Sequence, residues 1–174
     1  MKYSIRTLIF LNSLISFTAA ATDVNFQGRL IDDACQIAQP GVPLEVDFGQ
    51  IAVNSLYDNT RTAGKSFTVS LINCNVSVAQ SVSVTFEGSP DAGGLAGYLA
   101  IAPSSTASGI GIGIETESGD LIALGTASPA TELVNGTNDI VFKSFVQGQP
   151  DSIANKTIAA GDFNSMATLS FNYQ

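Results

Sequence analysis

The stretch GDFNSMATLSFNYQ, residues 161–174, decides the fold class of this chain. Its apolar side chains share one face of an extended strand, with Met166 as the one exception, and nearly all of its polar side chains share the other. A period of two residues is typical of a β-strand with one buried face. The apolar positions are Phe163, Ala167, Leu169, Phe171 and Tyr173. No sequence follows this strand, so we expect one of its edges to lack a partner.

The same period recurs earlier in the chain. Residues 66–73, 81–86 and 140–146 each alternate apolar and polar side chains, and residues 110–114 alternate isoleucine with glycine. The bare glycine face of that last strand suits the close approach of another backbone. Turn sequences such as Asn135-Gly136 separate these runs, and no segment sustains the apolar stripe of a helix. Short strands at this spacing predict an all-β sandwich or barrel.

The N-terminus has the features of an export signal. Lys2 and Arg6 precede an apolar run over residues 7–17, and the alanines at 19–21 suit cleavage after Ala20 or Ala21. A membrane anchor is the alternative, but the apolar run is too short to cross a hydrocarbon layer about 30 Å thick. We therefore predict a signal peptide over residues 1–21.

Charge and residue usage exclude several functions. Without Lys2 and Arg6 the chain holds five basic residues against fifteen acidic ones, and this balance repels phosphate backbones, so no nucleic-acid partner is expected. The chain contains no histidine, which removes the commonest general base and metal ligand. Glu115 and Glu117, near Asp120, could bind calcium weakly, but solvated surface charge is the favoured interpretation. We expect no enzyme activity and no cofactor.

The two cysteines, Cys35 and Cys74, form an even pair in a chain that carries an export signal. Such a pair predicts one structural disulfide. A redox or metal site would need a Cys-x-x-Cys pair or histidine partners, and the sequence has neither. A bridge over a loop of this length stabilises a domain by about 4 kcal/mol in the chain-entropy model.

A second alternating segment directly follows the signal peptide. Val24, Phe26, Gly28 and Leu30 alternate with polar residues, at a position where chain termini are usually loose. An intact sandwich would use this segment as its first strand.

Four segments together resemble a chaperone–usher pilin, with most similarity to the minor subunits of P-type and type 1 pili. They are VNFQGRLIDDAC (24–35), VDFGQI (46–51), FTVSLINC (67–74) and the C-terminal stretch 161–174. Each motif is weak alone, but their order and the placement of the cysteines are specific.

The resemblance implies an incomplete immunoglobulin-like β-sandwich of six strands plus an N-terminal donor strand. The missing seventh strand would leave an apolar groove beside the C-terminal strand. A periplasmic chaperone would fill it first, and an outer-membrane usher would assemble the fibre. There the extension of a neighbouring subunit would fill the groove by β-strand addition. The implied regions are a signal peptide at 1–21, a donor extension at 22–33 and a pilin domain at 34–174.

Residue roles follow by position. Val24, Phe26 and Leu30 would enter the neighbour's groove, with Gly28 where the groove floor has no room for a Cβ. Four C-terminal residues would line this subunit's own groove or the core beneath it: Phe163, Leu169, Phe171 and Tyr173.

The resemblance implies a structural subunit of a cell-surface fimbria that supports adhesion. The short extension favours a minor or adaptor subunit over a major rod subunit. The alternative is a single-domain, carbohydrate-binding adhesin at the fibre tip. A secreted glycosidase on a sandwich would need aromatic sugar platforms, and the chain has no tryptophan.

Overall fold

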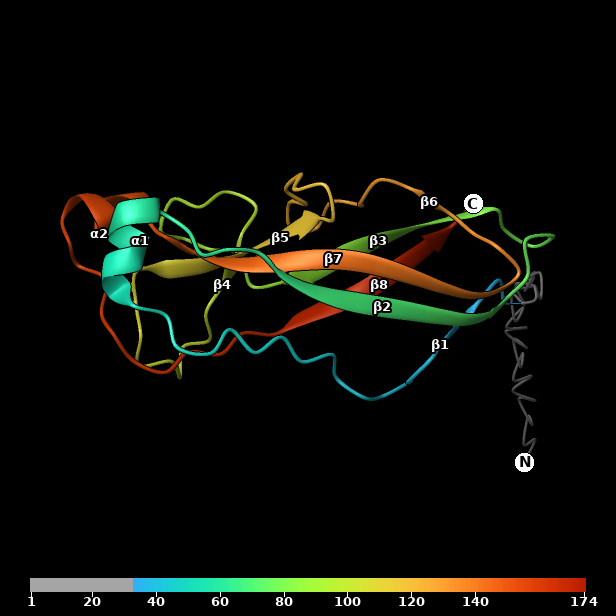
Figure 1. Cartoon of the computed structure of the whole chain (residues 1–174), viewed down its shortest axis with the longest axis horizontal. Coiled ribbons are helices and arrows are strands. Elements are labelled where there is room, and N and C mark those ends of the chain that lie inside the picture. Colours follow the sequence, from blue (N-terminus) through green and yellow to red (C-terminus); the bar gives the residue numbers. More distant parts are fainter. Residues whose placement is uncertain (1–32) are drawn as a thin grey trace, which may run out of the picture. The chain divides into compact units, whose positions relative to one another are not determined.

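The computed structural model describes residues 33–174, and its elements are nearly all strands (Figure 1). The predicted signal peptide and most of the predicted donor extension, including Val24, Phe26, Gly28 and Leu30, lie outside the described residues. From residue 33 onward, two helices and eight strands follow one another: β1 (Gln36–Ile37), α1 (Val53–Asn59), β2 (Lys65–Cys74), β3 (Ser81–Gly88), β4 (Leu99–Ala100), β5 (Ile110–Thr116), β6 (Thr131–Glu132), β7 (Gly136–Gly148), α2 (Pro150–Ala154) and β8 (Ala167–Tyr173).

The strands form two antiparallel sheets that pack as a sandwich. One sheet has the order β1-β2-β7-β5-β4 and the other the order β6-β3-β8. Three of the eight strands, β1, β4 and β6, are only two residues long. The predicted all-β, immunoglobulin-like class is confirmed, and five long strands carry most of the pairing.

The main core lies between the two sheets because the alternating strands turn their apolar faces inward. Val69 and Leu71 of β2 and Val84 and Phe86 of β3 are at most 2% exposed. The ring of Phe86 meets the ring of Phe142 edge to face, with centroids 5.1 Å apart. Such aromatic pairs add about 0.5–1.5 kcal/mol beyond the area they bury.

The glycines of β5 have a different role from the one expected. The sequence suggested that their bare face would receive another backbone, but a side chain fills the space at Gly113. A Cβ on Gly113 would lie 2.3 Å from the ring of Phe145, which pairs with it across β5 and β7. Gly111 similarly leaves room for Leu95.

Two predictions about local structure were wrong. The described residues contain two short helices where none was expected, because seven and five residues are too few to show a helical stripe. The last strand begins at Ala167 and not near Gly161. Phe163, before it, packs in a second cluster with Phe48, and the two ring centroids are 6.1 Å apart. Within residues 33–174, no helix is long and apolar enough to span a membrane.

The favoured interpretation of Glu115 as solvated charge was also wrong. Glu115 is 4% exposed and forms a two-pronged ion pair with Arg61, in which Nη1 and Nη2 each donate to a carboxylate oxygen at 3.0 Å. The Arg61 guanidinium also lies 3.4 Å from the centre of the Phe145 ring. This pair ties the segment after α1 to β5 and β7.

Candidate functional site

The candidate site is the open edge of β8, which pairs only with β3 among the described strands. Gln174 and Ser81 exchange both backbone hydrogen bonds, each at 2.9 Å. In an antiparallel ladder such pairs alternate along the strands, so Asn172, Ser170 and Thr168 also bond to β3. The N–H and C=O groups of the residues between them therefore point to the open edge: Leu169, Phe171 and Tyr173.

The side chains on this strand are only half covered. Leu169, Phe171 and Tyr173 pack against the main core, yet each keeps an intermediate exposure. Their neighbours across the ladder, Val84 and Phe86, are each 1% exposed. The far edge of β3 is occupied, since Ser128 and Gly125 donate backbone bonds to it. The core is thus closed behind β3 and left open beside β8.

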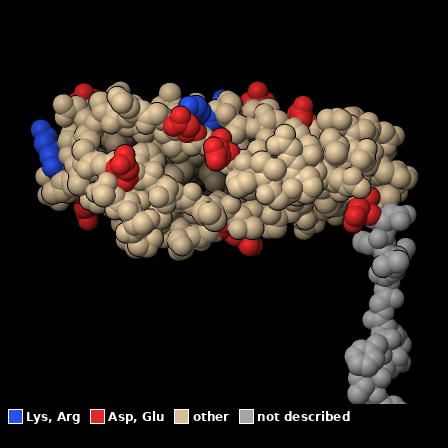
Figure 2. Space-filling model, turned by 90° about the horizontal axis from the view of Figure 1, so that it is seen from below, with Lys and Arg blue, Asp and Glu red and all other residues tan. Residues whose placement is uncertain are grey.

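A second row of apolar side chains lies on the segment before α1. Val42 and Leu44 are 59% and 52% exposed, and Val46 and Phe48 continue the alternation at intermediate exposure. Among the described residues, this segment makes no backbone hydrogen bond to β8. Figure 1 shows it passing below β2 as a plain coil, and in Figure 2 the face seen from there is mostly uncharged surface with scattered acidic groups. Both rows therefore keep part of their apolar surface exposed.

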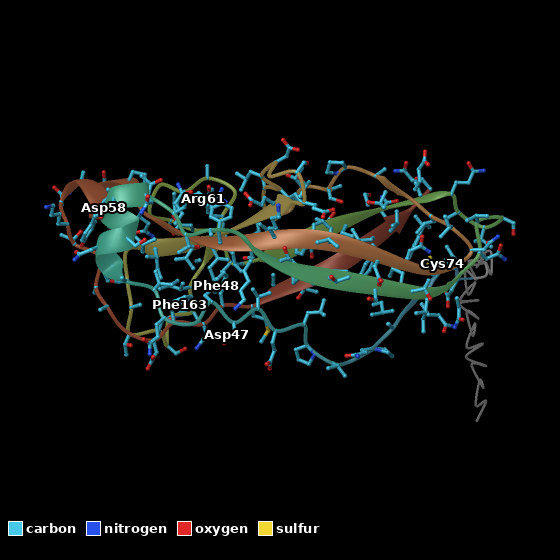
Figure 3. All side chains as sticks on the ribbon, viewed as in Figure 1. Asp47, Phe48, Asp58, Arg61, Cys74 and Phe163 are labelled. Carbon is cyan, nitrogen blue, oxygen red and sulfur yellow. A yellow bond between two sulfur atoms is a disulfide. The ribbon has the colours of Figure 1, made fainter. Side chains whose placement is uncertain are left out.

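The second row ends against the segment that leads into β8. Phe48 and Phe163, which precedes β8 by four residues, point toward one another in Figure 3, and their rings pack together. The far end of β8 has a shallow depression lined by Thr85, Ser170, Phe171, Asn172 and Tyr173. The site is therefore a strip along the edge of a strand and not a closed pocket.

The disulfide lies at the end of the sandwich where β8 finishes (Figures 1 and 3). Cys35 and Cys74 are bridged, with their Cα atoms 4.1 Å apart, which confirms the predicted pairing. Asn75 donates a backbone bond to Ala34 at 2.8 Å. Burial raises the pKa of the Tyr173 hydroxyl, and the Asp33 carboxylate raises it further. The start of the described chain is thus anchored close to the last residues of β8.

The structure brings together three of the four predicted groove residues: Leu169, Phe171 and Tyr173 share one face of β8. Phe163 lies before the strand, in the second cluster. Sequence reasoning missed Val42 and Leu44, although their alternation with Pro43 and Glu45 was a readable signal. Among residues 33–174, no three His, Cys, Asp or Glu side chains gather so that they could hold a metal ion.

Comparison with known proteins gives a consistent family. A family model described as "Fimbrial protein" matches residues 24–174. The chain is 34% identical to the major MR/P fimbria protein of Proteus mirabilis, over 93% of this chain and 92% of that protein. It is 28% identical to the fimbrial adapter PapK of Escherichia coli over the full length of both. The crystal structure of the P pilus rod subunit PapA matches with a TM-score of 0.69 at 20% identity, over 82% of this chain and all of that one.

Proposed function

This chain belongs to the fimbrial protein family, and from that premise we propose that the open edge of β8 receives the N-terminal extension of a neighbouring subunit. The chain is a subunit of a fimbria, a fibre carried on the cell surface and formed by polymerisation, and it is not an enzyme.

One observation carries the proposal: the free backbone groups and the half-covered side chains of β8 belong to the same residues. Leu169, Phe171 and Tyr173 present both along one edge. An added strand with alternating apolar residues would satisfy those N–H and C=O groups and cover those side chains at once. Unpaired edges of this kind otherwise promote aggregation.

We assign the matching donor to residues 22–31 of each chain. Val24, Phe26 and Leu30 have the two-residue spacing of one strand face, and Gly28 falls between them. The apolar side chains would enter the neighbour's strip, and Gly28 would cross a place without room for a Cβ. Residues 1–21 would be the signal peptide that is removed on export.

We infer an assembly route as well. An open apolar edge needs cover before the fibre forms, and a periplasmic chaperone that supplies a temporary strand would provide it. An outer-membrane usher would then exchange the chaperone for the next subunit. We also propose that the finished fibre supports adhesion.

We propose a minor or adaptor position in the fibre, supported by the short extension and by the full-length match to the adapter PapK. The relatives also include a major fimbria protein, so subunit counting is the direct test. Isotope-labelled peptide standards would give the ratio of this chain to the most abundant subunit in purified fibres. A ratio far below one is expected, and parity would show a rod subunit.

The alternative function is a sugar-binding adhesin at the fibre tip. A tip subunit accepts a strand and donates none, whereas the donor role makes residues 22–31 necessary for attachment to a neighbour. Deletion of 22–31 therefore separates the two functions.

The test uses the ladder of detergent-resistant multimers in unheated gels of periplasm and fibres. Wild type should enter the ladder, and the deletion variant should accumulate as a disulfide-bonded subunit that never sits inside the fibre. Gly28→Val should act similarly, because a branched side chain would overpack the receiving strip at a cost of about 1–3 kcal/mol. Phe26→Asp should block assembly by placing a charge among apolar side chains.

Gln27→Ala is the matched control, since it changes the polar face of the same segment. It should assemble like wild type. A deletion variant that still occupies internal positions would refute the donor role.

A further inference from the structure

An exposed apolar pair lies at the end of the sandwich that carries the disulfide. Val134 is 62% exposed and Val78 is 42% exposed. Their loops are joined, because the Val76 N–H donates to Asn135 Oδ1 at 3.0 Å and the Leu133 N–H donates to the Gln80 carbonyl at 2.8 Å. We call Val78 and Val134 the end patch. Within the part of the chain that the structure describes, neither residue belongs to a core cluster.

The end patch lies beside the point where the described chain begins. The backbone N–H of Asn75, three residues before Val78, donates to the Ala34 carbonyl, and Cys74 is bridged to Cys35. The proposed donor segment ends at Ile31, so only Asp32 and Asp33 separate it from Ala34 in this anchored base. The three steps from Ile31 to Ala34 span at most about 11 Å when the chain is extended. A subunit that holds the donor segment must therefore lie against this end.

We infer that the end patch forms a second, side-chain contact with the neighbour that receives this chain's extension. The inference rests on the donor role proposed above. Its partner is a fimbrial subunit with an apolar, uncharged surface beside the receiving strand.

The direction of the added strand indicates which part of the neighbour is met. An antiparallel donor would place its base, near Leu30, at the start of the receiving strand, and antiparallel pairs are slightly the more stable. A parallel donor would place that base at the neighbour's own disulfide end, where the neighbour's extension also departs. At the start of β8 this chain exposes Met166, which is 85% exposed. An equivalent residue in the neighbour would meet Val78 and Val134, and methionine adapts well to such contacts.

The contact would give the joint between subunits stiffness. A donor strand and a two-residue tether fix the distance between two subunits, but they leave one subunit free to rotate about the tether relative to the other. A second contact, on a different part of the surface, would restrict that rotation. Because the patch is exposed, its substitution should leave the subunit's own fold intact.

The test places a photo-activated crosslinking amino acid at Val134 in assembled fibres. Leu121, which is 46% exposed on the turn after β5, is the matched control. Irradiation should crosslink position 134 to the neighbouring subunit, while position 121 should give little product. Mass spectrometry of the product should place the link near the start of the neighbour's last strand.

A variant measures the mechanical consequence. Val134→Asp should leave the multimer ladder unchanged but shorten the persistence length of fibres in electron micrographs, whereas Leu121→Asp should change neither. An intact ladder with no crosslink from position 134, or with equal crosslinks from both positions, overturns the end-patch contact and leaves the donor role standing. Loss of the wild-type ladder itself would overturn both.

Discussion

Single residues show how the body of this subunit is held around its open edge. Arg61 and Glu115 are 54 positions apart in sequence, yet they form the one salt bridge found among the described residues. The Glu115 side chain is 6% exposed and the Arg61 side chain 36%. Removal of one partner from such a pair leaves a buried charge without compensation, which costs far more than the pair contributes.

Arg61→Leu should therefore lower the free energy of unfolding by about 3 kcal/mol, near the lower limit for buried pairs because Arg61 is partly solvated. Urea unfolding of the subunit with a bound donor peptide would measure the loss. The double variant Arg61→Leu, Glu115→Leu should recover part of it, since no carboxylate is then buried. A double variant less stable than the single one would contradict this account.

Tyr173 offers a direct probe of the site. Its raised pKa means that the fold favours the neutral phenol, chiefly because of burial. This contribution to stability is complete below the ordinary pKa of about 10 and is lost as pH rises through the raised pKa. Donor binding should bury the ring further and raise the pKa again, as an ultraviolet absorbance titration would record.

Tyr98 is the internal reference for that titration. Burial also raises its pKa, but its hydroxyl donates to Gln147 Oε1, on the residue that pairs with Gly111 of β5. The pH of the Tyr98 transition should not change when donor peptide binds. The transition that shifts with peptide should be absent from Tyr173→Phe. An unchanged Tyr173 transition at saturating peptide would show that the strand binds elsewhere.

At the scale of elements, β8 is the one long strand that stands at the end of a sheet among the described residues, and it carries alternating apolar side chains along that open edge. Its half-covered face contrasts with the fully buried apolar face of β3, although the two strands form one ladder. The isolated subunit should accordingly be poorly stable and prone to oligomerise.

A synthetic donor peptide should raise the stability of the isolated subunit. A peptide of residues 22–31, or the matching segment of a neighbouring subunit, should stabilise the isolated subunit by about 2.7 kcal/mol at a free concentration near 100 times its Kd. Thermal melting followed by circular dichroism would show the shift. The Gly28→Val peptide is the control and should have little effect. If the isolated subunit stays monomeric and has the same melting temperature with either peptide, it is a complete sandwich and the prediction is wrong.

At the scale of the whole molecule, the disulfide joins the base of the predicted extension to the end of β2. It therefore fixes where the extension leaves the sandwich as well as stabilising the fold. The bridge contributes about 4 kcal/mol in the chain-entropy model, a large share of the 5–15 kcal/mol that a domain usually has.

Cys35→Ser should sharply lower the amount of subunit recovered from the periplasm, as measured by immunoblot. Cys35→Ser, Cys74→Ser should lower it equally, because either change removes the whole bridge. Yield at the wild-type level in both variants would show that the bridge is dispensable for folding.

Sequence alone determined the features that depend on local pattern. Alternation at 66–73 and 167–173 identified strands, the cysteine pair identified the bridge, and the motifs identified the family. A two-residue period needs only neighbouring positions to be read. It could not show where the last strand begins, because Phe163 keeps the period without a partner strand.

Only the tertiary structure decided the features that depend on contacts between distant residues. Glu115 is buried because Arg61 arrives from another segment, and Gly113 is needed because the Phe145 ring lies over it. Phe163 joins a second cluster because Phe48 packs against it. The coverage of an edge is likewise a long-range property. Pairing shows that β3 is covered on both sides and β8 on one among the described residues, although the two strands have the same alternation.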